Sequence, residues 1–399
     1  MDIGWFGLAL AASARFMSVY AIRVGASPTE LGLLASLPSL VLLFASALAV
    51  RWRRRYPSST RAVFWPAFGF RLSFLLPVFT PFFPHEWQPV WLILSVTIPA
   101  LPQGVGSIIF LIMMREAVHD QAMTALVSRR ALAMNISVAL GAVAFGFWLE
   151  RVAFPLNYQL MFLFAFVITL VSLWHVNRVR PMIAPVIDAV NHPSVPRIPW
   201  RDPAFRRVAF ITAIMHIGFF SVFPLMPLYL VDGLGANEGF MALISLAELA
   251  AAASVASIAC RIVARIGNRS TIALGMSGTA LGAFSIALAP GLYYTVPAAL
   301  LTGASWTLAG IGLFGYFTEH SPKEENSRYT TAYMQVVASS MFVAPLIGSA
   351  LAENGIELVY VLLIGAGLRL LAALFTDMNG VTHRFRWETL RPHFRGYGA

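Results

Sequence analysis

Charged side chains are scarce in this chain of 399 residues, at 12% of the total against 58% hydrophobic residues. A water-soluble domain carries about 25% charged residues, because its surface must face water. The mean hydropathy of +0.73 points the same way. We therefore expect much of the surface to face the hydrocarbon of a membrane.

Cysteine and the usual catalytic motifs are also missing or rare. The single cysteine, Cys260, excludes a disulfide framework and any multi-cysteine metal site. The sequence has no H-E-x-x-H, no G-x-S-x-G, no aspartate-rich pair and no phosphate-binding loop of the Walker type. We therefore expect no enzymatic activity, no cofactor, no metal site and no ATP-driven pump.

What the chain does contain is a series of long apolar runs bounded by charge, proline or glycine. A membrane-spanning helix needs about 20 apolar residues, and lipid offers no partner for free backbone groups. The first run contains Leu8–Ala14, but Asp2 and the continuation to Ile22 favour a retained helix over a signal peptide. The sequence predicts an all-α membrane protein with twelve transmembrane helices: 3–23, 30–50, 62–81, 89–114, 131–149, 157–176, 206–230, 238–260, 270–288, 292–317, 329–352 and 356–376.

The arginines alternate between the two sets of connections. One set, at 51–61, 115–130, 177–207, 261–269, 323–328 and 384–395, carries most of the 28 Lys and Arg residues, whereas the opposite set carries only Arg23 and Arg151. Because Lys and Arg gather on the cytoplasmic side, we expect a multi-pass protein of the cytoplasmic (inner) membrane with both termini in the cytoplasm. The charge is spread over several connections, so lipid headgroups are a sufficient partner and no nucleic-acid partner is expected.

Sparse identities relate the two halves of the sequence. Gly25-Ala26 returns as Gly235-Ala236, and Ser128-Arg129 returns as Ser327-Arg328. We therefore predict two pseudo-symmetric six-helix bundles. The expected division is an N-terminal bundle (1–176), a proline-rich cytoplasmic linker (177–207), a C-terminal bundle (208–377) and a cytoplasmic tail (378–399).

Three segments resemble the major facilitator superfamily, a likeness that extends over nearly the whole chain. Arg23–Ser36 is similar to the family's link between its first two helices, Arg261–Arg269 to its basic signature loop, and Glu319–Arg328 to its loop before helix 11. The resemblance implies a transporter fold and candidate gating residues Arg51, Arg55, Arg261, Arg265, Gly267 and Arg269.

The signature loops depart from the family pattern. The expected aspartate is Arg54 in the first half and Ala264 in the second, and the following glycine is Pro57 in the first half. The fifth helix also lacks the Gly-Pro pair associated with antiporters. These departures argue against proton antiport.

Ionisable groups in mid-membrane are costly and are therefore candidates for function. At 1.5 Å per residue, Arg15, Arg71, His216 and Glu248 all fall near the midplane. Glu248 is a candidate for proton coupling, the alternative being an ion pair with Arg15 or Arg71 that holds the helices together. Arg15 is a candidate for binding an anionic substrate, the alternative being a salt bridge to Glu248. For Arg71 we favour a structural pairing, and for His216 a hydrogen-bonded neutral ring over a proton relay.

Other side chains complete the candidate set. Gln103 lies between Pro102 and Gly104, where it can present an amide to a central cavity. Tyr20 and Trp306 can stack on a substrate ring, although packing is the simpler role for each. Arg369 lies near the expected cytoplasmic end, where its side chain can extend to the interface.

The leading hypothesis is a secondary transporter that moves a small anionic or amphipathic solute by alternating access, energised by an ion gradient or by the gradient of the solute itself. The alternative is a non-transporting protein of the same fold that serves as an assembly factor or sensor. We expect a monomer with a small-molecule substrate.

Overall fold

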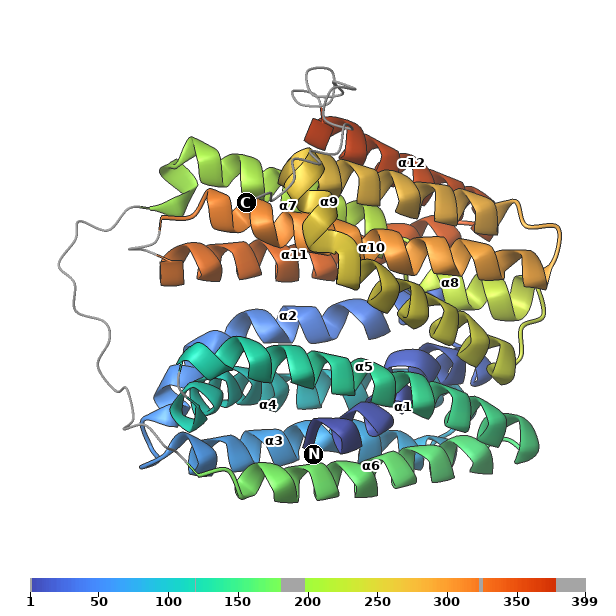
Figure 1. The fold of residues 1–399 in the computed structure, drawn as a ribbon. Helices are drawn as coiled ribbons and strands as arrows, with labels where there is room; N and C mark the ends of the chain where they lie inside the picture. The colour runs from blue at the N-terminus through green and yellow to red at the C-terminus, as the bar shows by residue number, and fades with distance from the viewer. Residues whose placement is uncertain (1, 119, 181–197, 323–325, 378–399) are drawn as a thin grey trace, which may run out of the picture.

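The computed structural model describes residues 2–118, 120–180, 198–322 and 326–377, and Figure 1 shows the fold. Within these ranges the regular elements are helices. In chain order they are α1 (Asp2–Arg23), α2 (Pro28–Arg53), α3 (Ser59–Leu75), η1 (Leu76–Phe82), η2 (His85–Trp87), α4 (Gln88–Ala117), α5 (Asp120–Arg151), α6 (Leu156–Asn177), η3 (Pro199–Arg201), α7 (Pro203–Phe220), α8 (Leu225–Leu228), η4 (Tyr229–Gly233), α9 (Glu238–Ala287), η5 (Leu292–Tyr294), α10 (Thr295–Glu319), α11 (Asn326–Glu353) and α12 (Leu358–Asp377).

In the described part of the chain, eleven helical segments are long and apolar enough to cross a membrane, and one of them, α9, covers two of the predicted spans. The seventh span consists of α7, α8 and η4, with an interruption before Leu225. The twelve predicted spans are therefore all present.

The predicted loop at 261–269 is wrong in its extent. Helix α9 continues through Arg261 and Arg265, and its only non-helical residue is Gly267, at φ 79° and ψ 165°. Alanine and arginine are good helix formers, so nothing before Gly267 stops the helix. The turn between the eighth and ninth spans is thus reduced to a single glycine.

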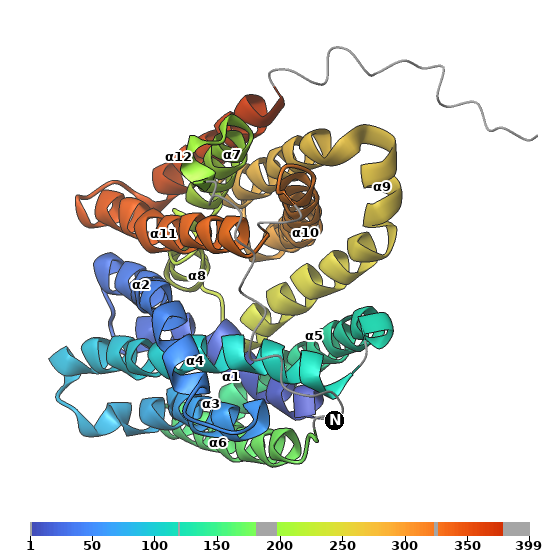
Figure 2. The same ribbon diagram turned by 90° about the vertical axis from the view of Figure 1, so that its left-hand side faces the viewer.

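The spans form two six-helix bundles, α1–α6 and α7–α12, which lie side by side in Figures 1 and 2. Between the bundles, α2 packs against α11 and α5 packs against α9. Residues 181–197 of the predicted linker and the tail at 378–399 lie outside the described residues.

The helix ends reproduce the sequence repeat. Gly25 and Gly235 both have positive φ, 85° and 73°. At Gly25 the amides of Gly25 and Ala26 donate to the carbonyls of Ile22 and Ala21, the Schellman pattern that a glycine permits at a helix end. The next helix of each bundle begins with a side-chain cap. The amide of Glu30 donates to Oγ of Ser27, and the amide of Phe240 donates to Oδ1 of Asn237.

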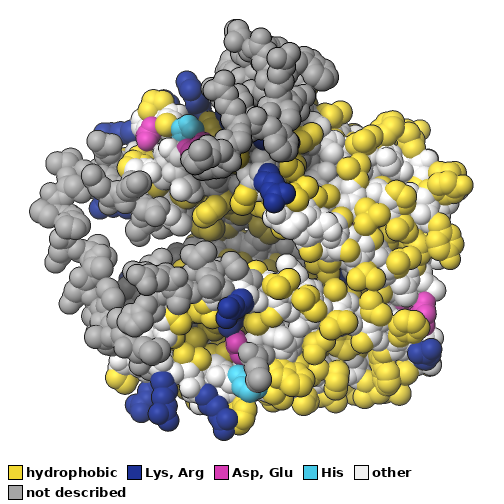
Figure 3. Space-filling view, viewed as in Figure 1, with side chains coloured by type: hydrophobic (Ala, Val, Ile, Leu, Met, Phe, Trp, Pro, Cys, Tyr) yellow, Lys and Arg dark blue, Asp and Glu magenta, His cyan; other side chains and the backbone are white. Residues whose placement is uncertain are grey.

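Large apolar side chains cover much of the outer surface, as the yellow area of Figure 3 shows. Trp65 on α3, Phe164 on α6 and Leu281 on α9 are each more than half exposed. Such a surface is stable only when lipid covers it. We call the end of the bundles that carries Arg51, Arg55, Arg261 and Arg265 the arginine-rich end, and the opposite one the far end.

Candidate functional site

Arg15 and Glu248 form an ion pair between the two bundles. Nη1 of Arg15 on α1 lies 2.9 Å from Oε2 of Glu248 on α9, and their side chains are 23% and 31% exposed. The pair lies about 12 Å from Arg23 along α1. Of the mid-membrane candidates, these two are brought together, and they join one bundle to the other.

Close helix packing fixes the position of Glu248. A β-carbon on Gly303 of α10 would overlap the backbone of Glu248, so only glycine allows this approach of α9 and α10. On the other side of the pair, Nε of Arg15 is buried and has no hydrogen-bond partner among the residues that the structure describes. The guanidinium therefore retains a free donor beside the carboxylate it holds.

Trp306 lies about one turn beyond Gly303 on α10, within an aromatic cluster. Its ring stacks on Phe219 with centroids 3.9 Å apart, and the ring of His216 meets it edge-on at 5.8 Å. His216 is buried, and its Nδ1 lies 2.8 Å from the carbonyl oxygen of Thr212. The histidine is thus satisfied within its own helix, and Trp306 is packed.

Tyr20 is fully buried inside the first bundle. Its ring stacks on Tyr158 of α6 at 4.4 Å between centroids. The ring of Tyr20 is therefore packed against α6, while its hydroxyl is buried and has no hydrogen-bond partner among the described residues.

Arg71 and Gln103 line a pocket of about 250 Å³ inside the first bundle. Arg71 donates to the carbonyl oxygens of Thr169 and Ala67, at 2.6 Å each, and to Oγ of Ser172 at 3.4 Å. At the arginine-rich side of this pocket, Arg130 pairs with Asp2 at 2.8 Å. Arg71 therefore joins α3 to α6.

The expectation that Arg369 reaches the interface is wrong. Its side chain is 2% exposed and donates to the carbonyl oxygens of Gly218, Phe219 and Thr279 at 3.1, 3.1 and 2.9 Å. The guanidinium also lies over the Phe219 ring, 4.7 Å from its centroid. Helix α12 turns this residue toward α7 and α9, and the carbonyls supply the polar partners that lipid lacks.

A second set of contacts between the bundles gathers at the far end. Glu238 at the start of α9 accepts from Arg23 at 2.9 Å and from the hydroxyl of Tyr158 at 3.1 Å. Nearby, Glu150 accepts from the amide of Gly239 at 3.2 Å, and Glu353 accepts from the amide of Thr29 at 3.2 Å. We call this set the far-end latch.

The sequence-based search missed the latch because its residues lie at helix ends rather than in mid-membrane. The available signal was Arg23, an exception in connections that otherwise carry almost no positive charge. A positive charge isolated in this way needs an acidic partner nearby.

The residues suggested as a gate are dispersed. In the first bundle Arg53, not Arg51 or Arg55, is engaged: it donates to Ser59 at 2.7 Å and to Glu116 at 3.3 Å. Ser59 itself donates to Glu116 at 2.7 Å. Arg51 and Arg55 line a separate groove. The sequence alone gave no reason to choose Arg53 and Glu116.

In the second bundle the polar contacts follow Gly267. Asn268 donates to Glu319 at 2.7 Å, and Arg269 donates to the carbonyl oxygen of Thr376 at 2.9 Å. Arg261 and Arg265 are exposed on α9. Both bundles thus tie the turn between their second and third spans to an acid at the end of a neighbouring helix, Glu116 or Glu319.

A family model described as "Major Facilitator Superfamily" matches residues 3–345, most of the chain. The chain belongs to the major facilitator superfamily. Among curated proteins no sequence matches it.

Solved structures with this superfamily fold include a D-xylose-proton symporter, at 16% identity and a TM-score of 0.73 over 94% of this chain and 95% of that one. The xylose transporter XylE from E. coli, in an inward-open conformation, is 13% identical in sequence, with a TM-score of 0.73 over 94% of each chain. The nucleoside transporter NupG is 11% identical in sequence, with a TM-score of 0.71 over 94% of this chain and 96% of that one. The chain shares its fold with these membrane transporters.

Proposed function

We propose that the protein is a secondary transporter that moves a small solute across the membrane by alternating access. The observation that carries this proposal is the Arg15–Glu248 ion pair, which spans the two bundles near the membrane midplane and is partly exposed. An ionic contact between bundles at this depth is a place where solute binding can change how the bundles associate.

The site favours a solute that carries a carboxylate or phosphate. Such a group would compete with Glu248 for the guanidinium of Arg15, whose Nε is already without a partner. A released Glu248 carboxylate at this depth would then need a proton or another cation. The same step can therefore couple solute binding to an ion gradient.

The arrangement of contacts supports a state that is open toward the arginine-rich end. The far-end latch holds the bundles together on one side of the pair, whereas Figure 3 shows the surface hollowed between the bundles toward the arginine-rich end. We propose that the protein lies in the cytoplasmic (inner) membrane with its arginine-rich end facing the cytoplasm, in line with the distribution of arginine. We further propose that the protein works as a monomer.

The test begins with a ligand screen and ends with transport. A thermal-shift screen against a metabolite panel should identify a solute that stabilises the purified protein, because a ligand that binds the folded state raises its stability. Uptake of that solute into proteoliposomes should then fall by at least about tenfold in Arg15→Gln and in Glu248→Gln, since each change removes one partner of the pair.

Exposed residues of the same type supply the controls. Arg206→Gln and Glu357→Gln change the same charges on exposed side chains and should retain uptake. If both pair variants transport at the control rate, the assignment of the site is wrong. If no solute is transported and a partner protein copurifies in equal amount, the alternative role in assembly or sensing is favoured.

A further inference from the structure

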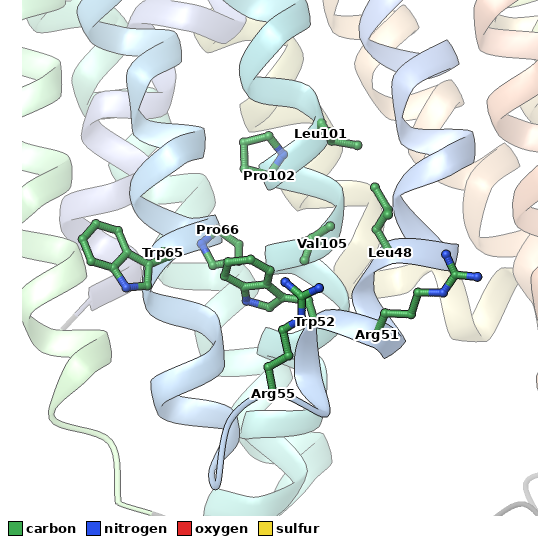
Figure 4. A pocket seen from close by; sticks show the side chains of 9 residues that line it. All are labelled: Leu48, Arg51, Trp52, Arg55, Trp65, Pro66, Leu101, Pro102 and Val105. Atoms are coloured by element: carbon green, nitrogen blue, oxygen red, sulfur yellow. The ribbon is translucent and has the colours of Figure 1, made fainter.

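A groove on the outside of the first bundle combines an apolar wall with two arginines. Side chains from α2, α3 and α4 enclose about 400 Å³ there. Figure 4 shows Leu101 and Pro102 at its upper end and Arg51 and Arg55 at its lower end. The groove therefore runs from the arginine-rich end toward the middle of the membrane.

The wall of the groove is exposed although it is apolar. Trp65 is 58% exposed, Leu48 40% and Leu101 37%. These side chains belong to helices α3, α2 and α4, away from the Arg15–Glu248 pair. Water is a poor solvent for such a surface, so we expect lipid chains to occupy it.

The positive charge at the lower end is available for an anion. Arg53, from the same segment, is already bound to Ser59 and Glu116. Arg51 and Arg55 are exposed, and among the described residues no acidic side chain lines the groove. A phosphate is the group that two guanidinium groups would bind best.

The walls are fixed by a hydrogen bond at the same end. The indole Nε1 of Trp52 on α2 donates to the carbonyl oxygen of Ala62 on α3 at 2.9 Å. This bond holds the ends of the two helices at a constant separation. Arg51 lies on the last turn of α2, and Arg55 lies in the turn that follows, where its amide donates to the carbonyl oxygen of Trp52 at 3.1 Å. Both arginines are therefore presented from a preformed edge.

We propose that this groove binds an anionic phospholipid of the adjacent leaflet. Its headgroup phosphate lies between Arg51 and Arg55, and one acyl chain lies along Leu48, Trp65 and Leu101. Basic pockets between helices at the membrane surface bind anionic headgroups in this way. The apolar wall distinguishes a lipid from a free phosphate, which would have no use for it.

Native mass spectrometry of the purified, full-length protein tests the proposal by titration with phosphatidylglycerol. Each arginine near an anionic lipid changes affinity about fivefold, so the double variant R51Q/R55Q should bind phosphatidylglycerol about 30-fold more weakly. The control R54Q/R61Q removes the same charge from two exposed arginines that do not line the groove, and it should bind as the unchanged protein does.

Three further measurements decide the source of the anion and the state of the protein. Phosphatidylcholine should bind more weakly than phosphatidylglycerol, and inorganic phosphate at millimolar concentration should not displace the lipid. The lipid-free thermal midpoints of both double variants should agree, which excludes misfolding as the cause of lost binding. Equal loss of binding in the two double variants, equal binding of the two lipids, or displacement by phosphate would each overturn the proposal.

Discussion

A guanidinium buried in a membrane protein needs an acceptor for its donors, and Arg369 obtains three from backbone carbonyls of α7 and α9. Arg71 follows the same principle with the carbonyls of Thr169 and Ala67. Neither residue requires a carboxylate. Both therefore hold helices together, and we place neither in the solute site.

Substitution of Arg369 should cost stability rather than transport. In Arg369→Met three carbonyls lose their partner within the bundle, and bonds of this kind contribute about 0.6 to 1.7 kcal/mol each in membrane proteins. We expect a loss of about 2–4 kcal/mol in the free energy of unfolding, measured by steric trapping or denaturant titration in micelles.

The control for this prediction is Arg207→Met, which removes the charge of an exposed arginine on α7. It should change stability by less than about 0.5 kcal/mol. Equal stability of the two variants would show that the carbonyl contacts of Arg369 contribute nothing.

For single residues, the sequence predicted how deep a side chain lies in the membrane but not which side of its helix it lies on. It placed Arg15 and Glu248 near the midplane, and the structure joins them. It placed Arg369 near a helix end, from where the side chain could face either the lipid or the interior of the bundle. The carbonyls that select the inward rotation belong to Gly218, Phe219 and Thr279, which are remote in sequence.

At the scale of the element, α9 depends on one residue for its change of direction. Gly267 has φ 79° and ψ 165°, a region that only glycine occupies readily. Residues on either side of Gly267 are helical, so the whole change of direction depends on the backbone angles of this glycine.

Gly267→Ala should therefore lower the free energy of unfolding by about 1–3 kcal/mol, the usual cost of a side chain in this backbone region. Gly367→Ala is the matched control, because a β-carbon there meets nothing within 4 Å and alanine favours a helix. Thermal or denaturant unfolding of both variants checks the pair. The explanation fails if Gly267→Ala is as stable as the control.

The sequence predicted the helix ends better where it contained a stop signal. Gly25 and Gly235 end helices in both halves, as their repetition indicated. At 261–269 the arginines were interpreted as a loop, yet charge does not interrupt a helix. Only Gly267 in that segment has the geometry to do so.

At the scale of the whole molecule, the two bundles are held together by polar contacts of unequal depth. The Arg15–Glu248 pair lies in mid-membrane, and the far-end latch lies at the surface. Opening the far end requires Glu238 to release both Arg23 and Tyr158.

Glu238→Gln should therefore shift the population toward states that are open at the far end. Spin labels at Phe82 and Tyr293, exposed at that end in different bundles, report the separation by electron–electron resonance in a Cys260→Ala background. We expect a longer-distance component in the variant, because a weakened contact shifts a two-state equilibrium. Glu357→Gln, an exposed glutamate at the same end, should leave the distribution unchanged, and a shift in that control alone would contradict the role of the latch.

The architecture was predictable from the sequence because few backbone structures can span a membrane. Twelve apolar segments and the repeat of Gly25-Ala26 determine two bundles of helices. The latch was not predictable, since Arg23, Tyr158 and Glu238 meet only when the bundles are placed against each other. Pairing across bundles is a property of tertiary structure that helix periodicity does not contain.

The two buried guanidinium groups occupy equivalent places in the two bundles. Arg71 belongs to the third span of its bundle, reaches the sixth at Thr169 and lies over Phe6 of the first at 6.0 Å. Arg369 belongs to the sixth span of its bundle, reaches the third at Thr279 and lies over Phe219 of the first at 4.7 Å. Each bundle therefore has one buried cation where its first, third and sixth spans meet, supplied by the third span in one bundle and by the sixth in the other. The pseudo-symmetry of the two halves thus extends to the charge at this crossing but not to the helix that provides it.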